Sequence, residues 1–148
     1  MVVFQSALQT LKRYADFKGR APREEFWCFF VFVIVVNAVC SLAGLLLGFG
    51  AALGGLIGLL LVIPQVAVAV RRLHDLGRPG KELVVPCAML ALVPVAFAFR
   101  GFLPKIVALG FLGITILVFA NLLTLFVKKG SNVPNRYGAA PTAFSFAR

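Results

Sequence analysis

The feature that most constrains the fold is a long stretch without charge. The forty-five residues from Phe26 to Val70 include no Asp, Glu, Lys or Arg. A single membrane-spanning helix needs about 20 apolar residues, so this stretch is too long for one helix and suits two with a tight turn between them. Glycines cluster near its midpoint, where the turn is expected. The sequence therefore predicts two spans, at about 26–47 and 51–71.

Two further apolar runs predict spans at about 83–99 and 105–127. The composition agrees, because 61% of the residues are hydrophobic and only 14% are charged, against about 25% in soluble domains. We therefore expect one all-α integral membrane domain over residues 1–148, folded as a four-helix bundle with a cytoplasmic tail at 128–148.

The segment before the first span has helical periodicity with one apolar face. Phe4, Leu8 and Leu11 fall on one side of a helix over about residues 3–17, and Lys12 falls among the polar residues on the other. Such a pattern is typical of an amphipathic helix that lies in the plane of the membrane surface. Trp27, at the start of the first span, suits the boundary between water and lipid.

Two rows of glycines four residues apart run through the first two spans. Small residues at this spacing let helix backbones approach closely where no hydrophobic effect drives association. The rows predict close packing of the two spans on each other or, as an alternative, a seam between two copies of the chain. Their members are Gly44 and Gly48 in one row and Gly50, Gly54 and Gly58 in the other.

The most charged stretch of the chain follows the second span, from Arg71 to Gly80. It holds three arginines, the only histidine and one of the five acids. Arg71 and Asp75 are four residues apart and can pair on a helix. Gly77 is typical of the residue that follows a helix, so the second helix should continue past the lipid and end there.

Four spans bring both ends of the chain to one side of the membrane, and the basic residues concentrate on that side. Thirteen of the fifteen Lys and Arg residues fall there, and only Arg100 and Lys105 fall on the other. Short loops rich in Lys and Arg stay in the cytoplasm. The distribution therefore predicts that both termini are cytoplasmic.

Three motifs, taken in order, resemble one known family. They are Phe17-x-Gly19-Arg20-x-x-Arg23-x-x-Phe26-Trp27, Arg71-Arg72-Leu73-His74-Asp75-x-Gly77 and Asn135-Arg136-Tyr137-Gly138-x-x-Pro141. Together they are similar to the signatures of the domain of unknown function 805 family, which are small bacterial inner-membrane proteins of four predicted spans. The resemblance implies a fold and an inner (plasma) membrane location, but no activity. Lys81 stands where the family usually has Trp, and Ala140 stands where an acid is typical, so no role of those two residues carries over.

The predicted topology gathers the three motifs at one membrane face, where their polar residues form the candidate binding site. Guanidinium groups donate paired hydrogen bonds to phosphate oxygens, so we expect this face to bind anionic membrane lipids. Docking of a protein partner or a second copy of the chain is the other binding hypothesis. A purely structural interpretation also stays open, in which the arginines satisfy helix ends and pair with Glu24 and Asp75. The candidate residues are Arg20, Arg23, Trp27, Arg71, Arg72, His74, Asp75, Asn135, Arg136 and Tyr137.

Other classes of function have less support in the sequence. Adjacent helical residues point about 100° apart, so Asp75 is poorly placed to orient His74 as a general base. The three cysteines lie in apolar runs without metal-binding spacing, and we expect neither a metal nor a cofactor. The basic residues show no motif for nucleic acid. We expect a non-enzymatic protein. The alternative is a small transporter or channel subunit, or a membrane-embedded enzyme that uses His74 and Asp75.

Overall fold

The computed structural model describes residues 2–49, 52–98 and 101–139 of the chain. Within these residues every named element is a helix, so the all-helical class is confirmed. An isolated bridge between Asn135 and Gly138 is the one strand-like pairing recorded there. In chain order the elements are α1 (Val2–Lys12), α2 (Arg23–Leu46), α3 (Ala52–Asp75), a 3₁₀ turn η1 (Gly80–Leu83), α4 (Val84–Ala98) and α5 (Phe102–Val127).

The helix ends follow the local signals in the sequence. α2 ends one residue before Leu47, and Gly48 then adopts φ +80°, a left-handed conformation that suits glycine. α3 ends at Asp75, two residues before Gly77, whose φ is +73°. The N–H of Arg78 donates to the carbonyl of Leu73 at 2.9 Å, as in a Schellman ending. The predicted stop at Gly77 is confirmed.

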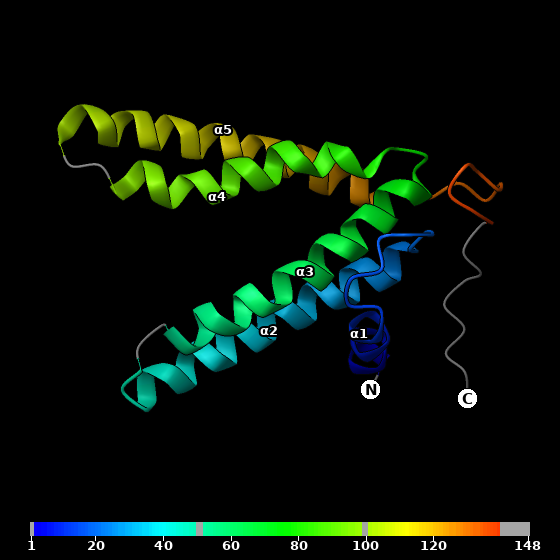
Figure 1. Ribbon diagram of the computed structural model, residues 1–148, viewed down its shortest axis with the longest axis horizontal. Helices are drawn as coiled ribbons and strands as arrows, with labels where there is room; N and C mark the ends of the chain where they lie inside the picture. The colour runs from blue at the N-terminus through cyan, green and yellow to red at the C-terminus, as the bar shows by residue number, and fades with distance from the viewer. Residues whose placement is uncertain (1, 50–51, 99–100, 140–148) are drawn as a thin grey trace.

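The long helices form two antiparallel pairs that meet at one end. α2 lies against α3, and α4 lies against α5, and the two pairs diverge away from the end where α2 begins and α3 and α5 end (Figure 1). The predicted four-helix bundle is therefore not confirmed. Lipid tails are as apolar as the exposed helix faces, so no hydrophobic effect draws the pairs together along their length.

The buried core lies where the two pairs meet. Phe26 and Phe29 of α2 pack there with Leu73 of α3 and with Leu122 and Phe126 of α5. The ring centroids of Phe26 and Phe126 are 4.4 Å apart. Elsewhere α2, α3 and α5 expose large apolar side chains over most of their length. The core thus holds together the same end of the molecule that carries the polar motifs.

One glycine row packs α3 onto α2 within the chain. A Cβ at Gly54 would collide with Ser41 of α2, and one at Gly58 would lie 2.8 Å from Oδ1 of Asn37. Gly44 is buried in α2. Gly48 belongs instead to the turn after α2 and is exposed, and Gly50 lies outside the described residues.

Three described helices are long and apolar enough to cross a membrane. They are α2, α3 and the Lys105–Val127 part of α5. α4 has 15 residues, which extend about 22 Å at 1.5 Å per residue. The hydrocarbon core is about 30 Å thick, so α4 as described falls short of it. Residues 99–100, at the end of the apolar run that contains α4, lie outside the described part.

α1 is shorter than expected and turns an unexpected face inward. It ends at Lys12, whereas the periodicity predicted a helix over about 3–17. Ser6, Ala7 and Thr10 are buried, while Phe4 and Leu8 are 58% and 42% exposed. Small side chains allow α1 to approach the start of α2 closely, and the large apolar ones are left on the outside (Figure 1).

Candidate functional site

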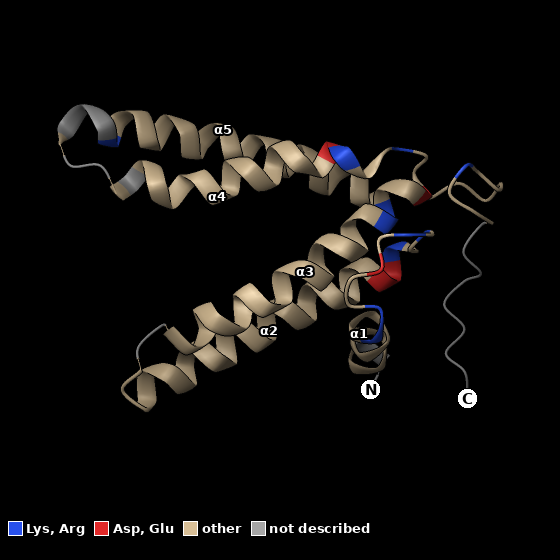
Figure 2. Cartoon of the chain, viewed as in Figure 1, with Lys and Arg blue, Asp and Glu red and all other residues tan. Residues whose placement is uncertain are grey.

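Charged residues gather at the end of the molecule where the helix pairs meet. Figure 2 shows most of the blue and red segments there, and one blue segment near the start of α5 at the opposite end. Residues 16–25, 71–80 and 128–139 converge at this end, and we call them the polar cap. They contain most of the three sequence motifs, so the structure brings these motifs together as the predicted topology required.

Asp75 is the centre of the polar cap. Its Oδ1 accepts two hydrogen bonds from Arg20, at 3.0 Å from Nε and 2.9 Å from Nη2. Its Oδ2 accepts a hydrogen bond from Nη1 of Arg72. The three side chains are only 1% to 4% exposed. One carboxylate thus compensates two guanidinium groups that could not be buried alone.

The remaining donors of these two arginines satisfy backbone carbonyls. Arg72 donates from Nη2 to the carbonyls of Phe126, at 3.2 Å, and Lys128. These carbonyls lie at the end of α5, where no further helical N–H can reach them. Arg20 donates from Nη1 to the carbonyl of Val133 at 2.9 Å and from Nη2 to that of Ser131. The pair therefore closes the end of α5 and holds the segment that follows it.

Arg71 points to the other side of α3 and pairs with a different acid. Its Nη2 lies 2.6 Å from Oε1 of Glu25, and both side chains are buried. Its Nη1 donates to the carbonyl of Asp16 at 2.8 Å. The predicted pairing of Arg71 with Asp75 is therefore wrong. Successive helical residues point about 100° apart, so Arg72 faces Asp75 and α5 while Arg71 faces the start of α2.

His74 joins the first and third motifs. Its ring stacks on that of Tyr137, with the centroids 3.8 Å apart and the planes 6° from parallel. Its Nδ1 lies 3.1 Å from the carbonyl of Gly19, which can only accept, so Nδ1 carries the proton in this contact. Asn135 donates from Nδ2 to the carbonyl of His74 at 2.9 Å. Asp75 accepts from Arg20 and Arg72, so it does not orient His74 for acid–base chemistry.

Three of the predicted site residues lie outside this buried network. Trp27 packs edge-on against Phe26 and Phe30, with ring centroids 5.3 and 5.6 Å away. Arg23 is exposed and lies 3.3 Å from Glu24. Arg136 is exposed and lies over the ring of Tyr137, 4.8 Å from its centroid. Trp27 therefore belongs to an aromatic cluster, and the two arginines belong to the surface of the polar cap.

Two residues that were not among the predicted site residues, Glu25 and Gly130, complete the cap. Glu25 was not among the predicted site residues, whereas Glu24 was expected to pair with an arginine. In the structure Glu25 is buried against Arg71, and Glu24 is exposed beside Arg23. Gly130 approaches Asp75 so closely that any Cβ there would collide with Oδ2. The charge beside an apolar run was a usable signal for Glu25, but none distinguished Gly130 from other loop glycines.

One more acid lies at the edge of the polar cap. Arg13 donates to Oδ2 of Asp16 from Nε at 2.9 Å and from Nη2 at 2.7 Å. This hydrogen bonding lowers the pKa of Asp16 from its ordinary value. Asp16 is therefore fully charged at neutral pH and offsets Arg13 at the surface.

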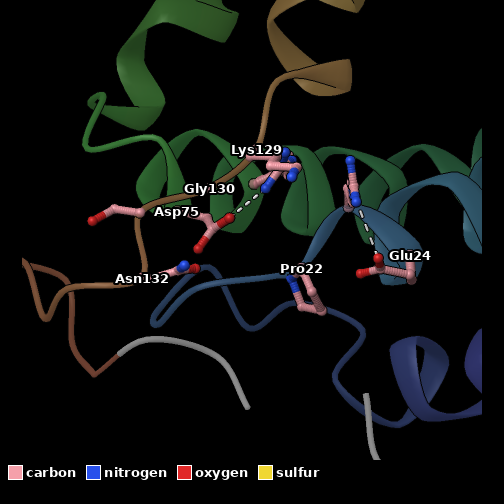
Figure 3. A pocket seen from close by; sticks show the side chains of 9 residues that line it. Pro22, Glu24, Asp75, Lys129, Gly130 and Asn132 are labelled. Carbon is pink, nitrogen blue, oxygen red and sulfur yellow. Dashed lines mark hydrogen bonds and ion pairs between the residues drawn. The ribbon is translucent and has the colours of Figure 1, made fainter. Parts of the chain in front are cut away.

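A pocket of about 340 Å³ opens beside Asp75. Figure 3 shows Pro22 and Glu24 on the side where α2 begins, and Gly130 and Asn132 on the side of the segment after α5. Arg72 and Asp75 also line the pocket, paired with each other. Arg23, Glu24, Lys129 and Asn132 line it as well, and all four are exposed. The pocket therefore has a charge-compensated floor and a rim of accessible polar groups.

The chain matches known sequences over nearly all of the region that forms this cap. The family model described as "Protein of unknown function (DUF805)" matches residues 14–139. Inner membrane protein YhaI of Escherichia coli K12 is 33% identical over 135 residues, which cover 90% of this chain and 92% of YhaI. Inner membrane protein YhaH of the same strain is 41% identical over 76 residues, which cover 48% of this chain and 63% of YhaH. No solved structure matches the chain.

Proposed function

This chain belongs to the DUF805 family of proteins of unknown function, and from that premise we propose that it is a non-enzymatic, multi-pass inner-membrane protein whose cytoplasmic end binds anionic lipid headgroups. Its relatives YhaI and YhaH are inner membrane proteins. The three membrane-length helices support the same location for this chain.

Contacts across the polar cap support four crossings with both termini on one side of the membrane, and the concentration of Lys and Arg there supports the cytoplasmic side. Arg20 precedes α2, yet it donates to the carbonyls of Ser131 and Val133, which follow α5. The two segments therefore lie on the same side of the membrane, and the chain between them crosses an even number of times. Three membrane-length helices alone would give an odd number of crossings, so a fourth crossing is needed. The apolar run that contains α4 supplies it in this proposal. In this arrangement α1 lies at the membrane surface, with Phe4 and Leu8 directed to lipid.

The observation that carries the lipid proposal is the division of charge at the end of the molecule that holds the polar cap. Each of the five acids pairs with an arginine in the described residues. The five lysines at this end have no acid partner in that same part of the chain, and all are exposed. We call them the lysine rim, which consists of Lys12, Lys18, Lys81, Lys128 and Lys129. Near an anionic membrane surface each such cation adds about 1 kcal/mol of attraction.

The buried arginines have a different role from the one that the sequence suggested. Arg20 and Arg72 donate to acids and carbonyls within the chain, and Arg71 does so from Nη1 and Nη2 while its Nε has no partner among the described residues. They stabilise the cap, as the structural interpretation proposed, and the lipid-binding charge is left to the lysine rim. A dimer seam through Gly54 and Gly58 is disfavoured, because α2 already occupies that face of α3.

The test is the lipid composition around the full-length protein extracted from membranes in polymer nanodiscs. We expect anionic phospholipid to be enriched over the bulk membrane and the enrichment to fall as salt is raised. Replacing all five residues of the lysine rim with Gln should abolish the enrichment, while replacing them with Arg should preserve it. Lys105→Gln, at the opposite end, is the matched control and should have no effect. Enrichment that survives the five Gln substitutions would overturn the proposal.

A further inference from the structure

We propose that the pocket beside Asp75 is a specific site for one phosphodiester group of a membrane lipid, held by Arg23 and Lys129. This inference rests on the proposed lipid-binding function and deepens it, since it assigns the tightest headgroup site to one place in the polar cap. The pocket's volume of about 340 Å³ is near the lower limit of ordinary ligand pockets. It suits a headgroup rather than an acyl chain.

The charged side chains at the floor of the pocket, Arg72 and Asp75, already have partners within the chain. Oδ1 of Asp75 is taken by Arg20 and Oδ2 by Arg72. Arg72 donates its other hydrogen bonds to carbonyls at the end of α5. An anion entering the pocket therefore meets little repulsion from Asp75, whose charge two buried guanidinium groups compensate. The groups that bind the anion must therefore belong to the rim of the pocket.

The rim presents two available cations and one acid. Lys129 has no acid partner among the described residues and is exposed. Arg23 contacts Glu24 at 3.3 Å, but both side chains are about half exposed, and such surface pairs are weak. Arg23 can therefore exchange the Glu24 carboxylate for a phosphate oxygen. The amide of Asn132 borders the same space and offers a further donor (Figure 3).

The charged groups at the rim, and Glu24 in particular, distinguish between phosphodiester and phosphomonoester ligands. Two cations and Glu24 leave one net positive charge at the rim. A phosphodiester carries one negative charge and a phosphomonoester about −1.5 to −2 at neutral pH, so Glu24 repels a monoester more strongly than a diester. The carboxylate can instead accept a hydrogen bond from a headgroup hydroxyl. The glycerol headgroup of phosphatidylglycerol has such hydroxyls and phosphatidic acid has no headgroup alcohol, so the site favours the diester phosphatidylglycerol over the monoester.

The position of the pocket points to lipid as the source of the phosphodiester. Arg23 and Glu24 form the first turn of α2, directly before the apolar run that starts at Phe26. Lys129 follows α5, which ends at Val127. The donors therefore lie where the membrane-length helices leave the hydrocarbon, at the depth of the headgroups.

Native mass spectrometry of the full-length protein in detergent tests the site by counting bound lipids during titration. We expect one phosphatidylglycerol to bind more tightly than the rest, and more tightly than phosphatidic acid. Removing both cations with Arg23→Gln and Lys129→Gln should weaken that first binding step roughly 25-fold, at about 5-fold for each cation. Lys18→Gln with Lys81→Gln removes the same charge away from the pocket and should weaken it much less. Unchanged unfolding temperatures would show that both variants fold.

Glu24→Gln gives a second measurement that does not depend on losing affinity. It should raise the affinity for phosphatidic acid roughly 5-fold and change that for phosphatidylglycerol less. Soluble glycerophosphoglycerol should not displace the first lipid, and displacement at equal concentration would assign the pocket to a free phosphodiester instead. Equal weakening by the two double variants, or none by either, would overturn the pocket and leave the lysine rim intact. Absence of anionic lipid binding in the wild type would overturn both proposals.

Discussion

Asp75 is the residue on which the polar cap most depends. Asp75→Asn would leave Arg20 and Arg72 buried with no counter-charge, and removing one member of a buried ion pair typically costs about 3–5 kcal/mol. We expect a loss of that size in the free energy of unfolding, measured by denaturant titration in detergent with Trp27 fluorescence. The control is Glu82→Gln, at an acid that pairs with Arg78 at the surface where both side chains are partly exposed, and it should cost less than about 1 kcal/mol. Equal losses would show that the buried triad is not the main contribution.

Arg20 tests the geometry of the same triad. Arg20→Lys keeps the charge, but a lysine cannot reach Asp75 and the carbonyls of Ser131 and Val133 together, because it lacks the planar fork of a guanidinium. Each lost hydrogen bond to a charged group is worth about 1.5–3 kcal/mol, so the segment after α5 should detach at least tenfold more often. Limited proteolysis with proteinase K should then cut residues 131–139 faster. Arg23→Lys, at an exposed arginine, should leave the cleavage rate unchanged.

At the residue scale, the sequence predicted which polar residues meet but not how they pair. Helical spacing allowed an Arg71–Asp75 pair, and the observed partners are Glu25 and Asp75 for Arg71 and Arg72 respectively. The choice depends on the rotation of α3 about its axis, which is set by packing against α2 and α5. Spacing along one helix carries no information about that rotation. For the same reason the sequence could not separate buried arginines from accessible ones.

At the element scale, α2 and α3 approach through glycine, and adjacent residues of α3 allow a matched comparison. A Cβ at Gly54 would collide with Ser41, whereas one at Gly55 would meet open space. Gly54→Leu should lower the free energy of unfolding by about 1–3 kcal/mol, as overpacking does, and Gly55→Leu should have little effect. Denaturant unfolding in detergent measures both. A large effect of Gly55→Leu would indicate a contact with a second molecule at that face.

The helices themselves were largely predictable, because length, hydropathy and glycine turns decide them locally. α2, α3 and α5 match the predicted spans to within a few residues. The arrangement of the helix pairs was not predictable, since apolar faces that contact lipid look the same in sequence as faces that contact another helix. α1 shows the same limit, because its buried face uses Ser6 and Thr10 rather than the apolar row.

At the scale of the whole molecule, sidedness is the decisive prediction. In a variant without native cysteines, Phe49→Cys in the turn after α2 should react with a membrane-impermeant maleimide from the periplasmic side. Lys18→Cys and Asn132→Cys should react only after the membrane is opened, since both positions belong to the polar cap, which we propose to be cytoplasmic. Equal protection of these two positions would be the sign of an even number of crossings between them. Residues 18 and 132 on opposite sides of the membrane would contradict both the topology and the lipid proposals.

The separation of arginines into ion pairs and lysines onto the surface has a chemical consequence. Primary amines react with acylating reagents under mild conditions, and guanidinium groups stay protonated and inert at the same pH. Acetylating the native protein should therefore strip its surface of lysine charge while every arginine–carboxylate contact survives. One treatment would then distinguish the part of the molecule that meets its surroundings from the part that holds it together, without a single substitution.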